Sequence, residues 1–166
     1  MNRKAKLLGH PIHQMLIVFP LGLLATAVVF DLVTLISGNS AWSSAAFYMI
    51  GAGIVGGLLA AMFGFWDWLT IPAGTRAKTI GAYHGVGNLA VVLLFVGSFV
   101  LRYNNPNIPG TMALACSFTA GMLALVTGWL GGELVDRLGV GVDANAHVNA
   151  PSSLKDRSYH DRSNAA

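Results

Sequence analysis

Four long stretches of the sequence contain no charged side chain. They cover residues 7–30, 32–66, 79–101 and 103–132. Each is at least as long as the roughly 20 residues that a helix needs to cross a hydrocarbon core about 30 Å thick. The pattern therefore predicts four membrane-spanning helices, over about 11–36, 43–70, 80–103 and 111–135.

The composition supports the same class of protein. Of the 166 residues, 54% are hydrophobic and only 10% are charged, and the mean hydropathy is +0.60. A soluble globular domain carries about 25% charged residues. The expected fold is all-α, an integral membrane four-helix bundle. The apolar run after Gln14 is longer than the roughly 7–15 residues of a signal-peptide core, so we expect it to remain in the mature protein.

Three regions follow from this pattern. Residues 1–10 form a basic N-terminus, residues 11–137 the four-helix domain, and residues 138–166 a polar tail that we predict to be flexible. Proline is favoured at the first position of a helix, so Pro11 is expected there, with His10 as the cap. Pro20 lies inside the first helix and is expected to kink it.

The basic residues predict the orientation in the membrane. With four spans, the N-terminus, the loop 71–79 and the C-terminus lie on one side. That side holds nine of the ten Lys and Arg residues, and Arg102 is the exception. The positive-inside rule then predicts cytoplasmic termini, in a multi-pass protein of a bacterial inner membrane. Basic residues in short loops beside spans give no indication of nucleic-acid binding.

Polar side chains are expected to gather at the cytoplasmic ends of the helices. The helices that begin there bring His10, His13 and His84, and those that end there bring Asp67 and Glu133. Asn88 lies four residues after His84, on the same helix face. Three histidines, one amide and two acids are therefore predicted to converge.

Two charged residues are expected at the opposite end. Asp31 lies eighteen residues after His13, and Arg102 lies eighteen residues after His84. The helices that carry them run parallel, so the two charges should lie at the same depth. An unpaired acid in a membrane is costly, which predicts a structural ion pair between Asp31 and Arg102.

At these residues the chain resembles a family of small bacterial membrane proteins, the domain-of-unknown-function family two-two-three-one. The resemblance covers about residues 7–141. Its motifs are Gly9 to His13 followed by Phe19–Pro20, Gly64 with Asp67, His84 with Asn88, and the segment 128–135. Gln14 stands where the family usually has a second proline. The resemblance implies a four-helix membrane domain without an established activity, and fusions of some relatives to Rieske modules suggest redox surroundings.

The first functional hypothesis is a cofactor site for membrane electron transfer with a redox partner protein. One b-type haem would be held by His13 and His84, with His10 as a substitute or third ligand. Asp67, Asn88 or Glu133 would accept the second imidazole N–H. A transition-metal ion would instead use His10, His13, His84, Asp67 and Glu133.

Two alternatives remain open. The histidines can be purely structural, hydrogen-bonded to the acids in a membrane subunit without a cofactor. A proton relay or transport component ranks lowest, because helix 3 has no polar residue through its centre (89–97). No serine or cysteine lies beside the histidines in sequence, so we expect no enzyme activity from the chain on its own. Small residues at four-residue spacing on the second and fourth helices fit packing within one bundle or in a homo-oligomer.

Overall fold

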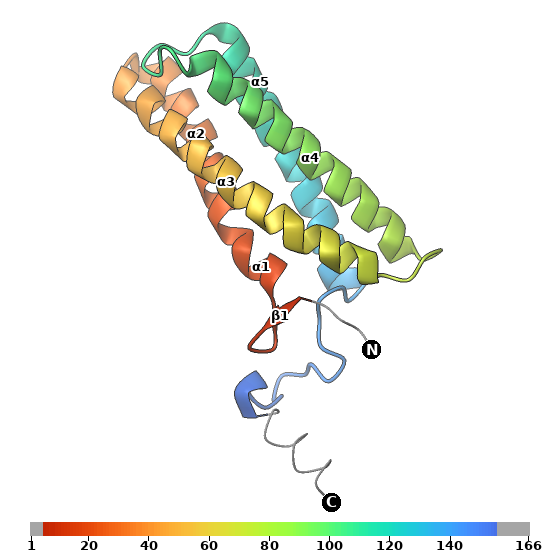
Figure 1. Ribbon diagram of the computed structural model, residues 1–166. Helices are drawn as coiled ribbons and strands as arrows, with labels where there is room; N and C mark the ends of the chain where they lie inside the picture. The colour runs from red at the N-terminus through yellow and green to blue at the C-terminus, as the bar shows by residue number, and fades with distance from the viewer. Residues whose placement is uncertain (1–4, 156–166) are drawn as a thin grey trace, which may run out of the picture.

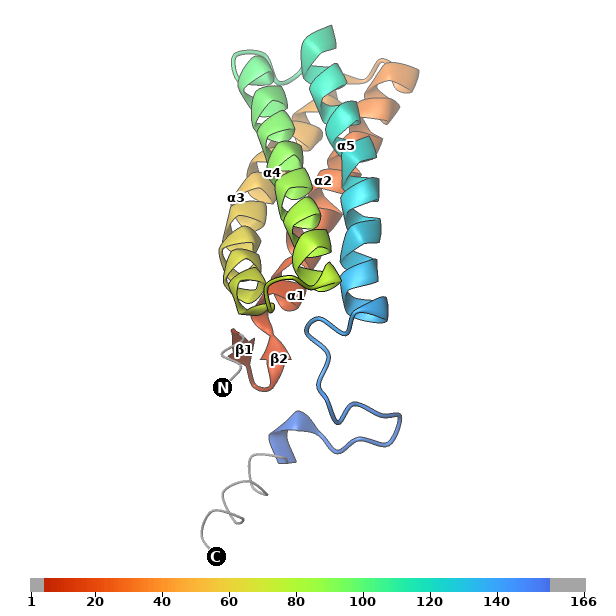
Figure 2. The ribbon, with the colours of Figure 1, turned by 90° about the vertical axis from the view of Figure 1, so that its right-hand side faces the viewer.

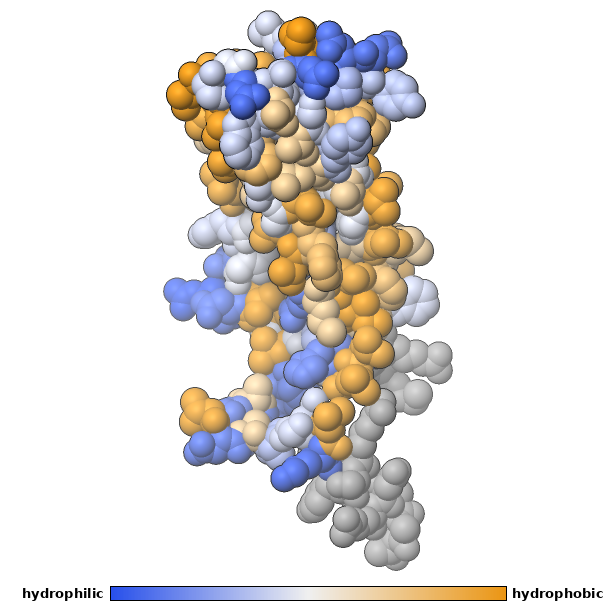
Figure 3. Space-filling view, turned by 90° about the vertical axis from the view of Figure 1, so that its left-hand side faces the viewer, coloured by the Kyte–Doolittle hydropathy of each residue, from blue (hydrophilic) through white to orange (hydrophobic). Residues whose placement is uncertain are grey.

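The protein is a bundle of four long helical units, and its computed structural model describes residues 5–155 (Figure 1). The units cover Ile12–Ser37, Ser40–Thr70, Arg76–Arg102 and Thr111–Arg137, and each is long and apolar enough to cross a membrane. The predicted all-α four-helix membrane fold is confirmed. Apolar residues dominate the side of the bundle, and hydrophilic residues gather at its two ends (Figure 3).

The helices form two consecutive hairpins. In the first hairpin α1 (Ile12–Leu16) and α2 (Val18–Ser37) pack against α3 (Ser40–Thr70), and in the second α4 (Arg76–Arg102) packs against α5 (Thr111–Gly132). We call the end of the bundle at Ile12, Thr70 and Arg76 the terminal end, and the opposite end the far end (Figure 2). Helices α2 and α4 run parallel, from the terminal end to the far end.

Capping residues set the helix boundaries, which differ from the predicted ones. The second unit begins at Ser40 instead of 43, because the side chain of Asn39 accepts a hydrogen bond from the backbone N–H of Ala41 at 3.0 Å. The third begins at Arg76 instead of 80, where Thr75 accepts from the N–H of Lys78 at 3.2 Å. Both are helix N-caps, whose preferences are local and strong.

The first unit is broken near its start. The predicted kink at Pro20 is replaced by a break at Ile17, between α1 and α2. Proline has no N–H, so Pro20 removes the hydrogen bond that the carbonyl of Leu16 would accept. The disruption therefore appears where that bond is lost, directly after Leu16 at the end of α1. Ile17 itself keeps helical bonds on both sides, to His13 and from Leu21, each at 3.1 Å.

A small β-hairpin precedes the first helix and corrects the prediction for His10. Strands β1 (Lys6–Leu7) and β2 (His10–Pro11) pair antiparallel, with Leu7 opposite His10. Leu8 and Gly9 have φ angles of 52° and 90°, as a two-residue type I′ turn requires. His10 is thus a strand residue, and Pro11 occupies the cap position in its place.

Part of the predicted flexible tail returns to this hairpin. The hydroxyl of Ser153 donates to the carbonyl of Leu8 at 3.0 Å, and the side chain of Gln14 donates to the carbonyl of Val140 at 3.3 Å. Lys6 and Asp143 form an ion pair at 3.5 Å. The tail is therefore anchored up to about Ser153, and the prediction for 156–166 falls outside the described residues.

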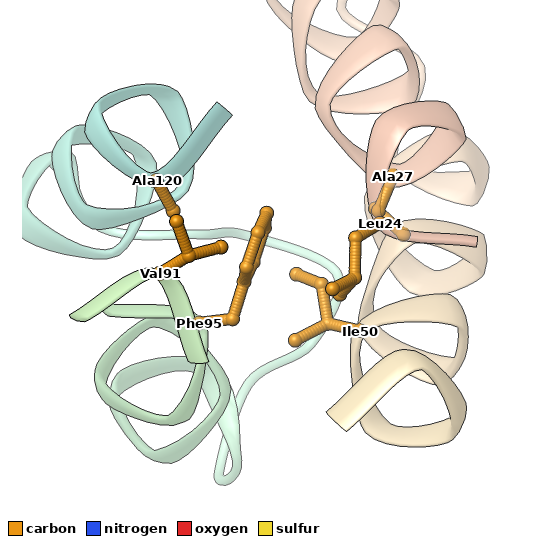
Figure 4. Close-up of a cluster of buried hydrophobic side chains, with 7 residues drawn as sticks. Leu24, Ala27, Ile50, Val91, Phe95 and Ala120 are labelled. Atoms are coloured by element: carbon orange, nitrogen blue, oxygen red, sulfur yellow. The ribbon is translucent and has the colours of Figure 1, made fainter. Parts of the chain in front are cut away.

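The apolar core is concentrated toward the far half of the bundle. Leu24 and Ile50 of the first hairpin point across to Phe95 of the second (Figure 4). Few side chains are buried in the terminal half of the described chain, and most are small: Ala60, Gly81 and Thr127, with Pro11, Pro20 and Leu134. Most of the large buried apolar side chains therefore lie toward the far end.

Candidate functional site

His13 is fixed against the neighbouring helix of its own hairpin. Its Nδ1 lies 2.8 Å from the carbonyl oxygen of Ala60 in α3. A carbonyl can only accept, so Nδ1 carries the hydrogen and the neutral ring has its lone pair on Nε2. The ring lies on Gly64, where a Cβ would stand 2.8 Å from Cε1 of His13. Glycine at this position makes the close approach possible.

His84 repeats this arrangement in the second hairpin. Its Nδ1 lies 2.9 Å from the carbonyl oxygen of Thr127 in α5. Its ring lies on Gly131, where a Cβ would stand 3.0 Å from Cε1 of His84. The same tautomer follows, with the lone pair on Nε2.

The match between the hairpins extends along their length. On the first helix of each hairpin the equivalent residues are 71 positions apart, and on the second helix they are 67 apart. The pairs are His13 with His84, Asp31 with Arg102, Ala60 with Thr127, and Gly64 with Gly131. Each glycine follows the carbonyl residue by one helical turn. The bundle is therefore an internal repeat of two parallel hairpins, and its histidines are equivalent.

Asn88 distinguishes the second histidine from the first. One amide hydrogen of Asn88 points to Nε2 of His84 at 3.2 Å, and the amide nitrogen also donates to the carbonyl of His84 at 2.8 Å. The hydroxyl of Thr127 donates to Oδ1 of Asn88 at 3.2 Å. The equivalent residues of the first hairpin, Ile17 and Ala60, are apolar.

The remaining predicted site residues lie elsewhere. His10 is exposed, with Nε2 3.4 Å from the hydroxyl of Ser153. Asp67 accepts from the backbone N–H of Ala5 at 3.2 Å, and Glu133 pairs with Arg76 at 2.7 Å. The expected roles of Asp67 and Glu133 as imidazole acceptors are thus taken by two backbone carbonyls.

The five-residue metal site is not assembled in this structure. Across residues 5–155 there is no group of three or more His, Cys, Asp or Glu side chains that could hold a metal ion. One cause is local: after Gly132 the last helix widens into a π-helix, η1 (Glu133–Arg137), in which the N–H of Leu138 bonds to the carbonyl of Glu133 at 3.2 Å. The Glu133 side chain there lies against Arg76.

Asp31 and Arg102 form the predicted ion pair at the far end. Two parallel bonds of 2.7 and 2.9 Å join the guanidinium to the carboxylate. Ser117 donates to the same carboxylate at 2.7 Å, and Arg102 donates to Ser98 at 2.9 Å. Both charged side chains are 0% exposed. The pair links the two hairpins through equivalent positions that carry opposite charges.

Sequence reasoning missed the two carbonyls, and it noted Gly64 and Gly131 only as parts of family motifs, not as the residues under the rings. A backbone acceptor has no side-chain signature, so Ala60 and Thr127 could not be identified directly. The spacing between the hairpins was a usable signal, since Gly64 and Gly131 are 67 residues apart, as Ala60 and Thr127 are.

Comparison with known proteins identifies the family. Residues 9–144 match the family model described as "Predicted membrane protein (DUF2231)", and the chain belongs to that family. No curated protein and no solved structure matches the chain.

Proposed function

We propose that this member of the DUF2231 membrane family binds one b-type haem between His13 and His84 and takes part in membrane electron transfer. The main support for the proposal is that the two histidines make the same hydrogen bond and have the same tautomer. Each donates Nδ1–H to a backbone carbonyl, which directs the Nε2 lone pair away from that contact. Metal-ligating histidines usually have such a partner, which fixes the ring and raises its basicity.

A haem suits these residues better than a free metal ion does. A porphyrin supplies four of the ligands to its iron, so two histidines complete the coordination. A protein-bound zinc ion, in contrast, usually takes three or four protein ligands. Asp67, Glu133 and His10 are engaged with other groups. The two histidines are thus sufficient for a haem and insufficient for a typical ion site.

The surroundings of the rings also favour a bulky, flat cofactor. The helices of a bundle commonly hold cofactors between them, and here the large apolar core lies toward the far half. Gly64 and Gly131 let each histidine lie close to its neighbouring helix. The two glycines therefore let each imidazole ring pack against the backbone of the neighbouring helix in its own hairpin.

The chain's own residues would hold and orient the cofactor. The carbonyls of Ala60 and Thr127 would keep each ring in the ligating tautomer. When bound, the haem supplies one-electron redox chemistry. Both histidines lie toward the terminal end, so one haem gives access to one side of the membrane. A redox partner protein is expected to dock at that end.

The visible spectrum of the purified protein tests the proposal. Protein expressed with a haem supply and isolated in mild detergent is expected to show a Soret band that shifts on reduction with dithionite. His13→Ala and His84→Ala should each remove or strongly alter it. His10→Ala is the matched control, because His10 is exposed and contacts Ser153. A colourless wild-type protein, or loss of the spectrum in the His10 variant alone, contradicts the proposal.

A structural role is the second candidate, supported by the same two carbonyl bonds. Each joins the two helices of one hairpin, at 2.8 Å for His13 and 2.9 Å for His84, and needs no ligand. In this case His13→Ala and His84→Ala lower the thermal stability of protein prepared without haem, and added hemin does not raise the stability of the wild type. Stabilisation of the wild type by hemin, absent in both variants, favours the haem site.

We also propose that the terminal end faces the cytoplasm of a bacterial inner membrane. The support is the distribution of basic residues, nine of ten on that side. In a Cys116→Ser background, Ile108→Cys lies in the far-end loop and Ala73→Cys in the terminal-end loop, and both positions are exposed. A membrane-impermeant maleimide should label only Ile108→Cys in intact cells. Labelling of Ala73→Cys instead reverses the orientation.

A further inference from the structure

The two equivalent histidines differ in what occupies Nε2, the atom that would bind iron. Asn88 follows His84 by one helical turn and points an amide hydrogen to its Nε2 at 3.2 Å. Ile17 follows His13 by the same four residues and has no polar atom in its side chain. His13 therefore serves as an internal control for the effect of Asn88 on His84, because both histidines make the same hydrogen bond to a backbone carbonyl.

The Asn88 amide is held in place from both sides. Its Oδ1 accepts from the hydroxyl of Thr127, and its nitrogen also donates to the carbonyl of its own helix at His84. An amide fixed in this way presents N–H, not oxygen, to the imidazole. Ligation through Nε2 of His84 must break the hydrogen bond from Asn88, whereas the hydrogen bond of His13 to the carbonyl of Ala60 uses Nδ1 and leaves Nε2 out of it.

We infer that His13 would be the permanent protein ligand of the iron, that His84 would be the exchangeable one, and that Asn88 is the positioning residue that creates this difference. The inference rests on the proposed haem site. Its consequence is a binding position for a small neutral diatomic ligand on the His84 side. In the exchange, Nε2 of His84 would leave the iron and return to the Asn88 N–H, and the small ligand would take its place. No electron or proton is transferred.

Carbon monoxide is the probe for this exchange in the reduced protein. The wild type is expected to bind CO. Asn88→Leu removes the competing hydrogen bond and lets His84 ligate permanently, so CO affinity should fall about fivefold, as expected for the loss of one neutral hydrogen bond. Ile17→Asn places the same amide beside His13 and should raise CO affinity. Equal affinity in the wild type and Asn88→Leu overturns the inference.

Thr127 supplies a matched pair of variants that does not alter Asn88 itself. Thr127→Val keeps the backbone carbonyl for His84 and the methyl group but loses the hydroxyl that holds Oδ1 of Asn88. It should shift CO affinity in the same direction as Asn88→Leu. Thr127→Ser keeps the hydroxyl and should behave as the wild type. If Asn88→Leu does not fold, this pair decides, and equal affinities for Val and Ser overturn the inference.

A measurement without haem separates this inference from the proposed function. Diethylpyrocarbonate acylates the unprotonated nitrogen of neutral imidazole, so in haem-free protein His13 should react faster than His84. Asn88→Leu should raise the rate at His84 and leave the rate at His13 unchanged. Absence of haem from the wild type with this rate pattern refutes the haem proposal but retains the Asn88 effect. Equal rates at His84 in both proteins refute the Asn88 effect.

Discussion

Breaking the Asp31–Arg102 pair should destabilise the bundle more than any substitution at the histidines. Arg102→Leu removes both bonds to the carboxylate, of 2.7 and 2.9 Å, and leaves Asp31 with only the hydroxyl of Ser117. Asp31 is completely buried. Removing one partner of a buried ion pair costs about 3–5 kcal/mol. That is a large part of the roughly 5–15 kcal/mol that stabilises a typical domain.

The double variant gives the decisive comparison. In Asp31→Leu/Arg102→Leu no charge remains in the buried cluster, and apolar replacement of a whole buried pair is often close to neutral. The double variant should therefore be more stable than either single variant. Such non-additivity is the signature of a direct interaction between two residues.

Unfolding of the haem-free protein in detergent, by titration with SDS and followed by far-UV circular dichroism, measures these differences. Val100→Leu serves as the control, since Val100 lies beside the pair in sequence and is exposed on the helix surface. A double variant that loses the sum of the two single losses refutes the reasoning. So does an Arg102→Leu protein within about 1 kcal/mol of the wild type, given the expected 3–5 kcal/mol.

Other substitutions test individual contacts by the same unfolding titration. Gly64→Ala should destabilise the protein and weaken any haem binding, because the new Cβ would lie 2.8 Å from the ring of His13. Gly128→Ala is the control. Its Cβ would have nothing within 4 Å, so it should be neutral or slightly stabilising. Equal effects of the two would contradict the contact. Thr75→Ala should cost about 1 kcal/mol through loss of the α4 cap, and Thr75→Ser should not. Ser153→Ala removes an exposed hydrogen bond and should change stability by less than about 0.5 kcal/mol; a larger change would assign the tail a greater structural role.

The spans were predictable from sequence because the membrane imposes a simple length requirement. A charge-free run long enough to cross the bilayer is expected to form a helix, because a helix satisfies its backbone hydrogen bonds within the segment. The depth of Asp31 and Arg102 followed from equal spacing along parallel helices, and their pairing followed from the cost of an unpaired charge. Asn88 and His84 share a helix face for the same geometric reason.

The orientation of side chains at the helix ends was not predictable in this way. Asp67 and Glu133 lie at the expected end of the bundle, yet helix periodicity does not predict the partner of either side chain. Asp67 accepts a hydrogen bond from the N–H of Ala5, the residue before strand β1. Glu133 lies in the π-helix η1 and pairs with Arg76. Helix periodicity gives the face of a residue only while the helix remains regular.

The acceptors of the two histidines could not be read from residue types. Any residue supplies a carbonyl, and whether it is available depends on how closely the helices approach. Gly64 and Gly131 decide this, and with 20 glycines in the chain the residue type alone does not indicate which of them lie under the rings. Only the repeat between the hairpins relates them to the histidines.

The uneven distribution of buried side chains has a mechanical consequence. The layer of Leu24, Ile50 and Phe95 and the charged cluster beyond it clamp the two hairpins together at one end. Among residues 5–155 the buried side chains at the terminal end are fewer and mostly small, so we expect the two hairpins to separate more easily there than at the far end. Such a separation would widen the space between His13 and His84 for a flat cofactor while the far end stays joined.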